Sequence, residues 1–252
     1  MKITFLGTGS PEGIPVMLCG CKLCASSKER LRPGLMIQQD EQNIILDAGP
    51  DIRKQIIQSG INKISAIFLT HYHFDHFWGV AEFEQLNWVG LGNFTTYLNN
   101  NTYEHLKSIP WIKLKCETLD FNNHINLKGL KIEAIKIEHA DYLEKSGYII
   151  RDECRKVVYI PDIKAISDLN LKKCENADIL VIDGQYILGK YIDDEDHLGG
   201  KELIKKIQEF NAKKIYLIGF SEHWYKKSAK DAEKQLPDNF NIPDDKTVLV
   251  LK

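Results

Sequence analysis

Long hydrophobic runs are absent from this sequence of 252 residues. No segment reaches the roughly 18 consecutive apolar residues that a membrane-spanning helix needs. The first residues lack the basic and apolar regions of a secretory signal peptide and alternate instead as a β-strand does. We therefore expect a cytoplasmic protein that does not interact with a membrane.

An excess of charge of one sign is also absent. The sequence has 33 Lys and Arg against 35 Asp and Glu, and the two signs are interleaved. No basic stripe is present of the kind that contacts a nucleic-acid backbone. The composition therefore argues against a nucleic-acid partner.

Repeats, low-complexity tracts and long linkers rich in Pro, Gly or Ser are absent as well. A chain of this length can bury a large core as one unit. We expect residues 1–252 to form a single domain.

Cysteine is scarce, with six residues in the chain. Three of them stand alone: Cys116, Cys154 and Cys174. The other three form a C-x-C-x-x-C motif of Cys19, Cys21 and Cys24. This spacing is too tight for a disulfide framework but suits a zinc ion, which needs a fourth ligand from elsewhere. His223 is our candidate, and a reduced loop without metal is the alternative.

Short apolar runs alternate with helical patterns along the chain. Strands are predicted at residues 1–6, 43–46, 64–69, 95–98, 132–137, 148–150, 157–160, 179–182 and 215–218. Helices are predicted at residues 51–59, 77–89, 102–108 and 201–210. Several strands are almost continuously apolar, which is typical of strands buried on both faces. The pattern indicates an α/β fold.

The segment His71-Tyr72-His73-Phe74-Asp75-His76 directly follows the apolar run at 64–69. Three imidazoles and a carboxylate in six residues are suited to zinc, manganese or iron. A polar turn or helix cap is the alternative interpretation. The carboxyl end of a buried strand is where α/β sheets place their ligands, so we favour a metal site.

Three further polar residues follow predicted strands or lie in later loops: His139, Asp162 and His197. Each alone is weak evidence for a ligand, since a single histidine is more often a core or surface residue with satisfied hydrogen bonds. Asp162 follows a proline, as an ordinary turn residue does. Their joint placement at one sheet edge would bring them to the same site.

Taken together, several segments resemble the metallo-β-lactamase superfamily over essentially the whole chain. These are residues 7–10 (GTGS), 46–49 (LDAG), 69–79 (LTHYHFDHFWG), His139, 159–162 (YIPD) and 196–198 (DHL). Within that superfamily the order of motifs is most similar to the phosphodiesterase branch, which holds tRNase Z and the PhnP-like phosphoribosyl cyclic phosphodiesterases. The cysteine loop resembles the PhnP-like members, which place a structural zinc there.

The resemblance implies an αββα sandwich with two catalytic divalent metals, zinc or manganese, and one structural zinc. It assigns the ligands as follows: His71, His73 and His139 to the first metal, Asp75 and His76 to the second, Asp162 to both. Two such metals can hold a hydroxide and clamp phosphate oxygens. His197 would then act as general acid or contact the phosphate, and Asp47 would orient a ligand histidine.

One position departs from the family pattern. Where the family carries a histidine after a late strand, this chain has Gly219. Either the second metal has only Asp75, His76 and Asp162 as protein ligands, or His223 replaces the missing one. His223 cannot serve both this site and the cysteines, and we favour the cysteines.

Three classes of function follow from these observations. The first is hydrolysis of a small cyclic phosphate or nucleotide-like phosphodiester. A homodimer is compatible with this function. The second is a tRNase Z-like RNA-processing nuclease, for which residues 89–95 are too short and uncharged to form an RNA-binding arm. The third is a binding protein without catalysis, because of Gly219.

Overall fold

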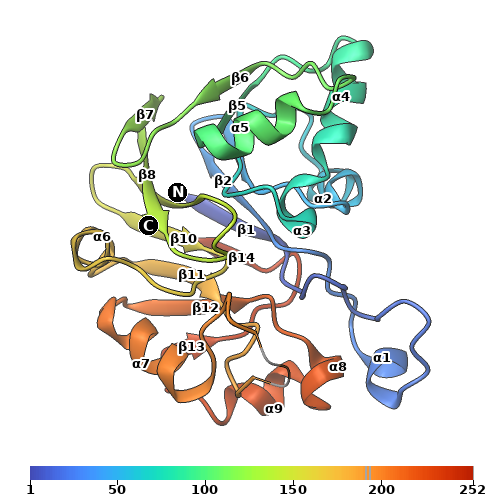
Figure 1. The fold of residues 1–252 in the computed structure, drawn as a ribbon, viewed down its shortest axis with the longest axis vertical. Coiled ribbons are helices and arrows are strands. Elements are labelled where there is room, and N and C mark those ends of the chain that lie inside the picture. Colours follow the sequence, from blue (N-terminus) through green and yellow to red (C-terminus); the bar gives the residue numbers. More distant parts are fainter. Residues whose placement is uncertain (191, 193, 252) are drawn as a thin grey trace.

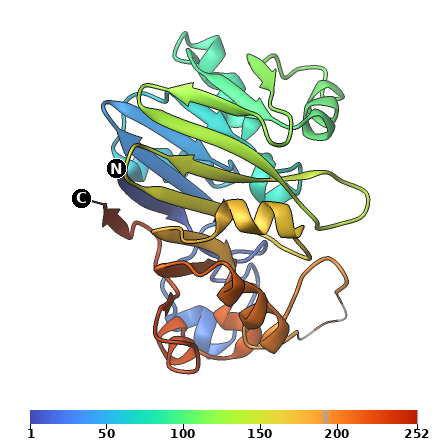
Figure 2. The same ribbon diagram turned by 90° about the vertical axis from the view of Figure 1, so that its left-hand side faces the viewer.

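The computed structural model describes residues 1–190, 192 and 194–251 (Figure 1). Within this part of the chain, two seven-stranded sheets pack face to face and helices cover their outer faces (Figures 1 and 2). This is the predicted αββα sandwich. No helix in the described part is long and apolar enough to cross a membrane.

The first sheet has the strand order β14-β1-β2-β3-β4-β5-β6. Its strands are β1 (Lys2–Gly7), β2 (Gly34–Gln39), β3 (Gln42–Leu46), β4 (Ala66–Phe68), β5 (Thr95–Leu98), β6 (Cys116–Thr118) and β14 (Val248–Val250). Strands β3 to β6 are mutually parallel, while β1 is antiparallel to both of its neighbours.

The second sheet has the order β13-β12-β11-β10-β9-β8-β7. Its strands are β7 (His124–Leu127), β8 (Leu130–Ile137), β9 (Lys145–Arg151), β10 (Lys156–Ile160), β11 (Ile179–Asp183), β12 (Lys214–Ile218) and β13 (Phe240–Asn241). Strands β10 to β13 are parallel, and β8 runs in the same direction because β9 is antiparallel to both β8 and β10.

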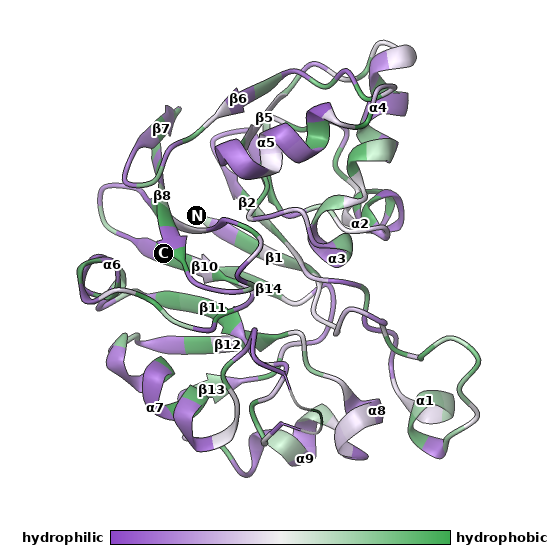
Figure 3. Ribbon diagram, viewed as in Figure 1, coloured by the Kyte–Doolittle hydropathy of each residue, from purple (hydrophilic) through white to green (hydrophobic). Residues whose placement is uncertain are grey.

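The helices are α1 (Lys22–Ser26), α2 (Ile52–Ser59), α3 (Phe74–Phe77), α4 (Val80–Trp88), α5 (Asn100–Lys107), α6 (Asp168–Cys174), α7 (Gly200–Glu209), α8 (Glu222–Tyr225) and α9 (Ala229–Glu233). Most helices cover the outer faces of the sheets, while α1 lies on a projecting loop (Figure 1). Figure 3 shows that polar residues dominate α5 and α7, whereas central strands such as β10 and β11 are largely apolar.

Three apolar clusters hold the layers together. The central cluster joins the facing sides of the two sheets, with Phe5 and Phe68 on one side and Tyr148 and Tyr159 on the other. A second cluster packs α2 to α5 against the outer face of the first sheet, and a third packs α6, α7 and α9 against the second. Strands buried on both faces explain the continuous apolar runs in the sequence.

Each of the strands predicted from the sequence is present, with end points shifted by a few residues. The predicted helix at 77–89 is wrong at its start, because Phe77 ends α3 and the next helix, α4, begins only at Val80, after Gly79. A Cβ atom at Gly79 would lie 2.4 Å from the carbonyl oxygen of Gly49, and the Gly79 N–H donates to Ala48. Close packing against the loop after β3 therefore interrupts the helix.

The parallel strands place their carboxyl ends at one edge of the sandwich. The first sheet ends there in Asp47 after β3 and His71 after β4, and the second in His139 after β8 and Asp162 after β10. The edge where these chain segments meet is the position expected for a ligand site.

Candidate metal centres

His71 presents one ring nitrogen to the sheet edge without a protein hydrogen-bond partner. The side chain is fully buried, and its Nε2 has no hydrogen-bond partner. Its Nδ1 lies 2.9 Å from the hydroxyl oxygen of Thr70, and that hydroxyl donates to Asp47 Oδ1 at 2.9 Å. The Thr70 oxygen therefore accepts the Nδ1 hydrogen, which leaves a lone pair on Nε2. A buried, unpartnered imidazole nitrogen is what a metal ligand requires.

His73 and His139 complete a first group with His71. The Nδ1 of His73 lies 3.2 Å from the Nε2 of His139, and the three ligand atoms lie within 4.8 Å of one another. The opposite nitrogens are engaged, since His139 Nδ1 donates to the Asp196 carbonyl at 2.8 Å and His73 Nε2 is 2.6 Å from the Tyr142 hydroxyl. Three converging imidazoles fit a divalent cation.

A second group contains His71, His76 and Asp162. Asp162 Oδ2 lies 3.4 Å from Nε2 of both histidines, so this oxygen faces both groups. His76 Nε2 is also 3.1 Å from Asp75 Oδ2, while its Nδ1 donates to Asp47 Oδ2 at 2.8 Å. The structure thus brings together all six residues that the sequence suggested for the catalytic metals.

Asp47 contacts His76 directly and His71 through the Thr70 hydroxyl. Its carboxylate accepts from the Thr70 N–H at 2.8 Å and the Tyr159 hydroxyl at 2.9 Å, in addition to its contact with His76. Its backbone has φ 62°, which is an uncommon conformation for a residue with a side chain. The hydrogen bonds hold the residue in this conformation at the site.

Burial and nearby carboxylates set the pKa values of the histidines. It lowers the pKa of His71, and it lowers that of His139 to about 3, so both are neutral as metal binding requires. Burial also acts to lower the pKa of His76, but the carboxylates of Asp75 and Asp162 raise it well above the ordinary value. The surroundings of His76 therefore favour positive charge, whether from a proton or from a metal ion.

Asp183 is a site residue that the sequence analysis did not assign. It is the last residue of β11, it is fully buried, and its Oδ2 lies 2.7 Å from the Nδ1 of His197. The N–H groups of Ile163 and Gln185 donate to the same carboxylate. Burial disfavours charge on His197, but Asp183 raises the pKa of the imidazole to about 9. Its position at a strand end next to a glycine was the available signal.

Lys145 was also missed. It begins β9, its side chain is fully buried, and its Nζ lies 2.7 Å from Asp162 Oδ2. Its distance to His71 Nδ1 is 3.4 Å. Burial raises the pKa of Asp162, but Lys145 and His76 together lower it far below the ordinary value. A lysine at the start of a strand gives no sequence signal for this contact.

Gly219 lies directly after β12, as predicted, with φ 80°. Its N–H donates to the Thr8 carbonyl, and a Cβ atom would lie 3.6 Å from the Cβ of Gln185. Residues with side chains rarely adopt this backbone conformation. The absence of a histidine here is therefore accompanied by a backbone suited to glycine.

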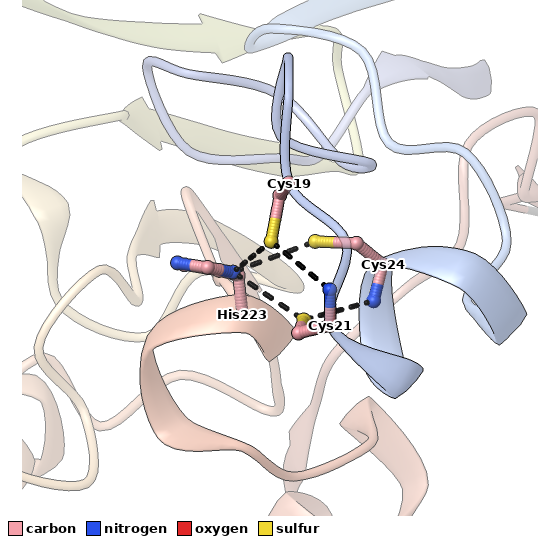
Figure 4. A group of neighbouring side chains, drawn as sticks. All are labelled: Cys19, Cys21, Cys24 and His223. Atoms are coloured by element: carbon pink, nitrogen blue, oxygen red, sulfur yellow. Dashed lines mark hydrogen bonds between the residues drawn. The ribbon is translucent and has the colours of Figure 1, made fainter.

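His223 lies with the cysteines. Its Nδ1 is 3.3 Å from Cys19 Sγ, 3.6 Å from Cys21 Sγ and 3.4 Å from Cys24 Sγ (Figure 4). The backbone N–H of Cys24 donates to Cys21 Sγ, and this bond together with His223 lowers the pKa of the Cys21 thiol to about 6. Three thiols and an imidazole that converge in this way match a closed zinc site.

The two-sheet sandwich and the His/Asp cluster at its edge define a metallohydrolase scaffold. A family model described as the beta-lactamase superfamily domain matches residues 42–220. The chain therefore belongs to the β-lactamase superfamily, as the sequence motifs indicated.

Curated relatives include an octanoyltransferase from Porphyromonas gingivalis, 27% identical over 73% of this chain and 39% of the relative. A ribonuclease Z from Pyrococcus abyssi is 24% identical over 74% of this chain and 61% of its own length. The chain thus spans less than two thirds of these relatives.

Among solved structures, a diphosphatase from the PhnP family superposes with a TM-score of 0.86 and 25% identity, covering 100% of this chain and 98% of that one. Zn²⁺-bound PqqB from Methylobacterium extorquens superposes with a TM-score of 0.84 at 18% identity, covering 100% of both chains, which shows the common fold.

Proposed function

We propose that this protein is a metal-dependent phosphodiesterase that hydrolyses a small cyclic phosphate or a nucleotide-like phosphodiester. The observation that carries the proposal is the meeting of three groups at one sheet edge. The His71–His73–His139 group shares His71 with the second group, and Asp162 of that second group lies beside the Asp183–His197 pair.

The residues of the first two groups would hold divalent metal ions. His71, His73 and His139 would bind one ion, Asp75 and His76 a second, and Asp162 Oδ2 faces both positions. Metal ions bound there would supply water activation and would stabilise negative charge on phosphate oxygens. The unpartnered Nε2 of buried His71 supports this use of the cluster.

His197 would donate a proton to the leaving oxygen. A ligand atom of His197 lies within 4.8 Å of an Asp162 carboxylate oxygen and of Asp183. Asp183 accepts the Nδ1 hydrogen, so the transferable proton is on Nε2. A charged partner at Nδ1 both fixes the ring and favours the protonated form that a general acid needs.

Two observations favour a small substrate over RNA. The superposition with a PhnP-family diphosphatase covers 100% of this chain and 98% of that one. The chain between α4 and β5 is short, since α4 ends at Trp88 and β5 begins at Thr95, which leaves no room for a long RNA-binding arm there. The ribonuclease Z relatives make RNA cleavage the second candidate.

For the cysteine site we propose a structural zinc. The Cys19–Cys24 loop and α8 are far apart in sequence and meet at this group (Figure 4). Four protein ligands close the coordination shell of zinc, so no position remains for a substrate.

The test is hydrolysis of bis-p-nitrophenyl phosphate by the purified chain with added Mn²⁺ or Zn²⁺. His73→Ala and Asp75→Ala are expected to abolish metal-dependent turnover while the thermal unfolding midpoint stays close to that of the unmodified protein. His124→Ala, which removes an exposed histidine on β7, is the matched control.

A panel of 2′,3′-cyclic nucleotides, ribose cyclic phosphates, linear dinucleotides and tRNA precursors then separates the candidates. Preference for a cyclic phosphate supports the proposal, and cleavage of the precursor RNA alone would replace it with a nuclease. Metal binding without turnover of any of these substrates would indicate a binding protein, in line with Gly219.

A further inference from the structure

A buried cation already occupies one side of the carboxylate that faces both metal positions. Lys145 is fully buried at the start of β9, and its Nζ lies 2.7 Å from Asp162 Oδ2. The same oxygen lies 3.4 Å from the Nε2 atoms of His71 and His76. The ammonium group and the two metal positions therefore share one carboxylate oxygen.

This arrangement affects the second metal position more than the first. The first metal position would have the three histidines His71, His73 and His139, with Asp162 beside them. The second has His76, the adjacent Asp75 and the shared Asp162, and Gly219 adds no side chain. A metal ion that depends more on Asp162 loses more when a positive charge at short range already neutralises this carboxylate.

In the described part of the protein, neither His223 nor Asp183 replaces the histidine that is missing at Gly219. His223 is directed at the three cysteines, with its Nδ1 within 3.6 Å of each sulfur. Asp183 is already engaged by His197 and by the N–H groups of Ile163 and Gln185.

We propose that the Lys145 ammonium acts as a fixed positive charge at the shared carboxylate, so that this chain binds one catalytic metal ion tightly, at His71, His73 and His139, and a second only weakly. The proposal builds on the metal-dependent function proposed above but concerns the number of ions bound without substrate. Lys145 is thus a positioning residue that acts through Asp162.

Titration with Mn²⁺ alone tests it, because thiolate ligands select softer metals and the cysteine site is left to its zinc. The full chain is freed of loosely held metal with a chelator, and bound Mn²⁺ is counted by equilibrium dialysis and by electron paramagnetic resonance. The spectrum distinguishes an isolated ion from a pair of neighbouring, magnetically coupled ions.

The unmodified protein is expected to bind one Mn²⁺ tightly, with an uncoupled spectrum. Lys145→Met, which keeps most of the side-chain volume and removes the charge, is expected to bind the second ion at least about tenfold more tightly and to give a coupled pair. Lys156→Met is the matched control, since Lys156 lies at the opposite end of β10 and its ammonium donates to the Lys173 and Glu175 carbonyls.

A coupled pair in the unmodified protein at low Mn²⁺ would overturn the proposal whatever the variants do. So would a second-ion affinity that is unchanged in folded Lys145→Met. If that variant does not fold, Lys145→Gln and the titration of the unmodified protein decide. Because no substrate is present, the ion count tests this proposal separately from the proposed function. One tightly bound ion without phosphodiester hydrolysis would leave this proposal standing, and hydrolysis with two tightly bound ions would overturn it alone.

Discussion

The Nδ1 atom of His223 lies 3.3 Å from the Sγ atom of Cys19, across 204 positions of sequence. This contact settles where His223 lies, since the same imidazole cannot also reach the metal position next to Gly219. It also joins the loop after β1 to α8, which follows β12 in the other sheet. Of the residues proposed for the second metal ion, Asp75, His76 and Asp162 therefore remain.

Loss of a cysteine ligand should act on stability. Cys21→Ala removes one of four converging ligands, so zinc should no longer hold the loop to α8. With free zinc at 100 times its Kd, a lost site costs about 2.7 kcal/mol of unfolding free energy. Thermal or urea unfolding with and without added chelator measures it. Cys154→Ala, at an exposed isolated cysteine, is the control, and an equal response to the chelator in both variants would contradict the assignment.

Removal of the Asp183 charge should move the pH profile. The carboxylate raises the pKa of His197 to about 9, and a general acid loses activity as pH rises through its pKa. Asp183→Asn should therefore shift the alkaline limb of kcat/KM toward lower pH, by about one unit or more.

Rates of bis-p-nitrophenyl phosphate hydrolysis from pH 6 to 10 provide the measurement for Asp183→Asn, with exposed Asp168→Asn as the control. An unmoved alkaline limb in the Asp183 variant would show that His197 does not set it.

The Tyr142 hydroxyl should strengthen metal binding through His73. It lies 2.6 Å from His73 Nε2, opposite the Nδ1 atom that faces His139. Partners of this kind orient a ligand imidazole, and their loss typically weakens metal affinity about 10- to 100-fold. Tyr142→Phe should therefore raise the Kd for the first Mn²⁺ ion, measured by dialysis.

Because Tyr142 is largely exposed, the thermal unfolding midpoint of the Tyr142→Phe variant should change little. Tyr103→Phe, on α5, serves as the control. Equal metal affinity in the two variants would remove Tyr142 from the site.

Asp245 should make stability depend on pH. Burial raises the pKa of its carboxyl to about 6, against about 3.9 in an unfolded chain. Because the folded value is the higher one, this group favours folding below pH 4, and its contribution is lost as pH rises toward 6. Two units correspond to about 3 kcal/mol.

Asp245→Asn removes this titration but keeps an acceptor for the Leu31 N–H or the Thr8 hydroxyl. Its unfolding free energy, relative to that of the unmodified protein, should therefore rise between pH 4 and pH 6 in urea titrations. Asp120→Asn, at an exposed position, should show no such trend. A constant difference for the Asp245 variant would refute the raised pKa.

Local pattern was enough for the alternation of strands and helices and for the loop that carries residues 71–76. Continuous apolar runs reflect burial on both faces of a strand, and neighbours in sequence remain neighbours in space. The family motifs added His139 and Asp162, which the structure places beside that loop.

The sequence predicted the cysteines as the partners of His223, whereas only the tertiary structure decided the contacts of His197 with Asp183 and of Asp162 with Lys145. Asp183 and Lys145 reach the site because β11 ends, and β9 begins, at the same edge of the second sheet. In the sequence, Asp183 offers only its place at a strand end before Gly184, and Lys145 offers no signal. Such pairings depend on how two sheets pack and on which side a chain turns after each strand. The sequence determines these only through the whole fold, whereas periodicity reports on the immediate surroundings of each residue.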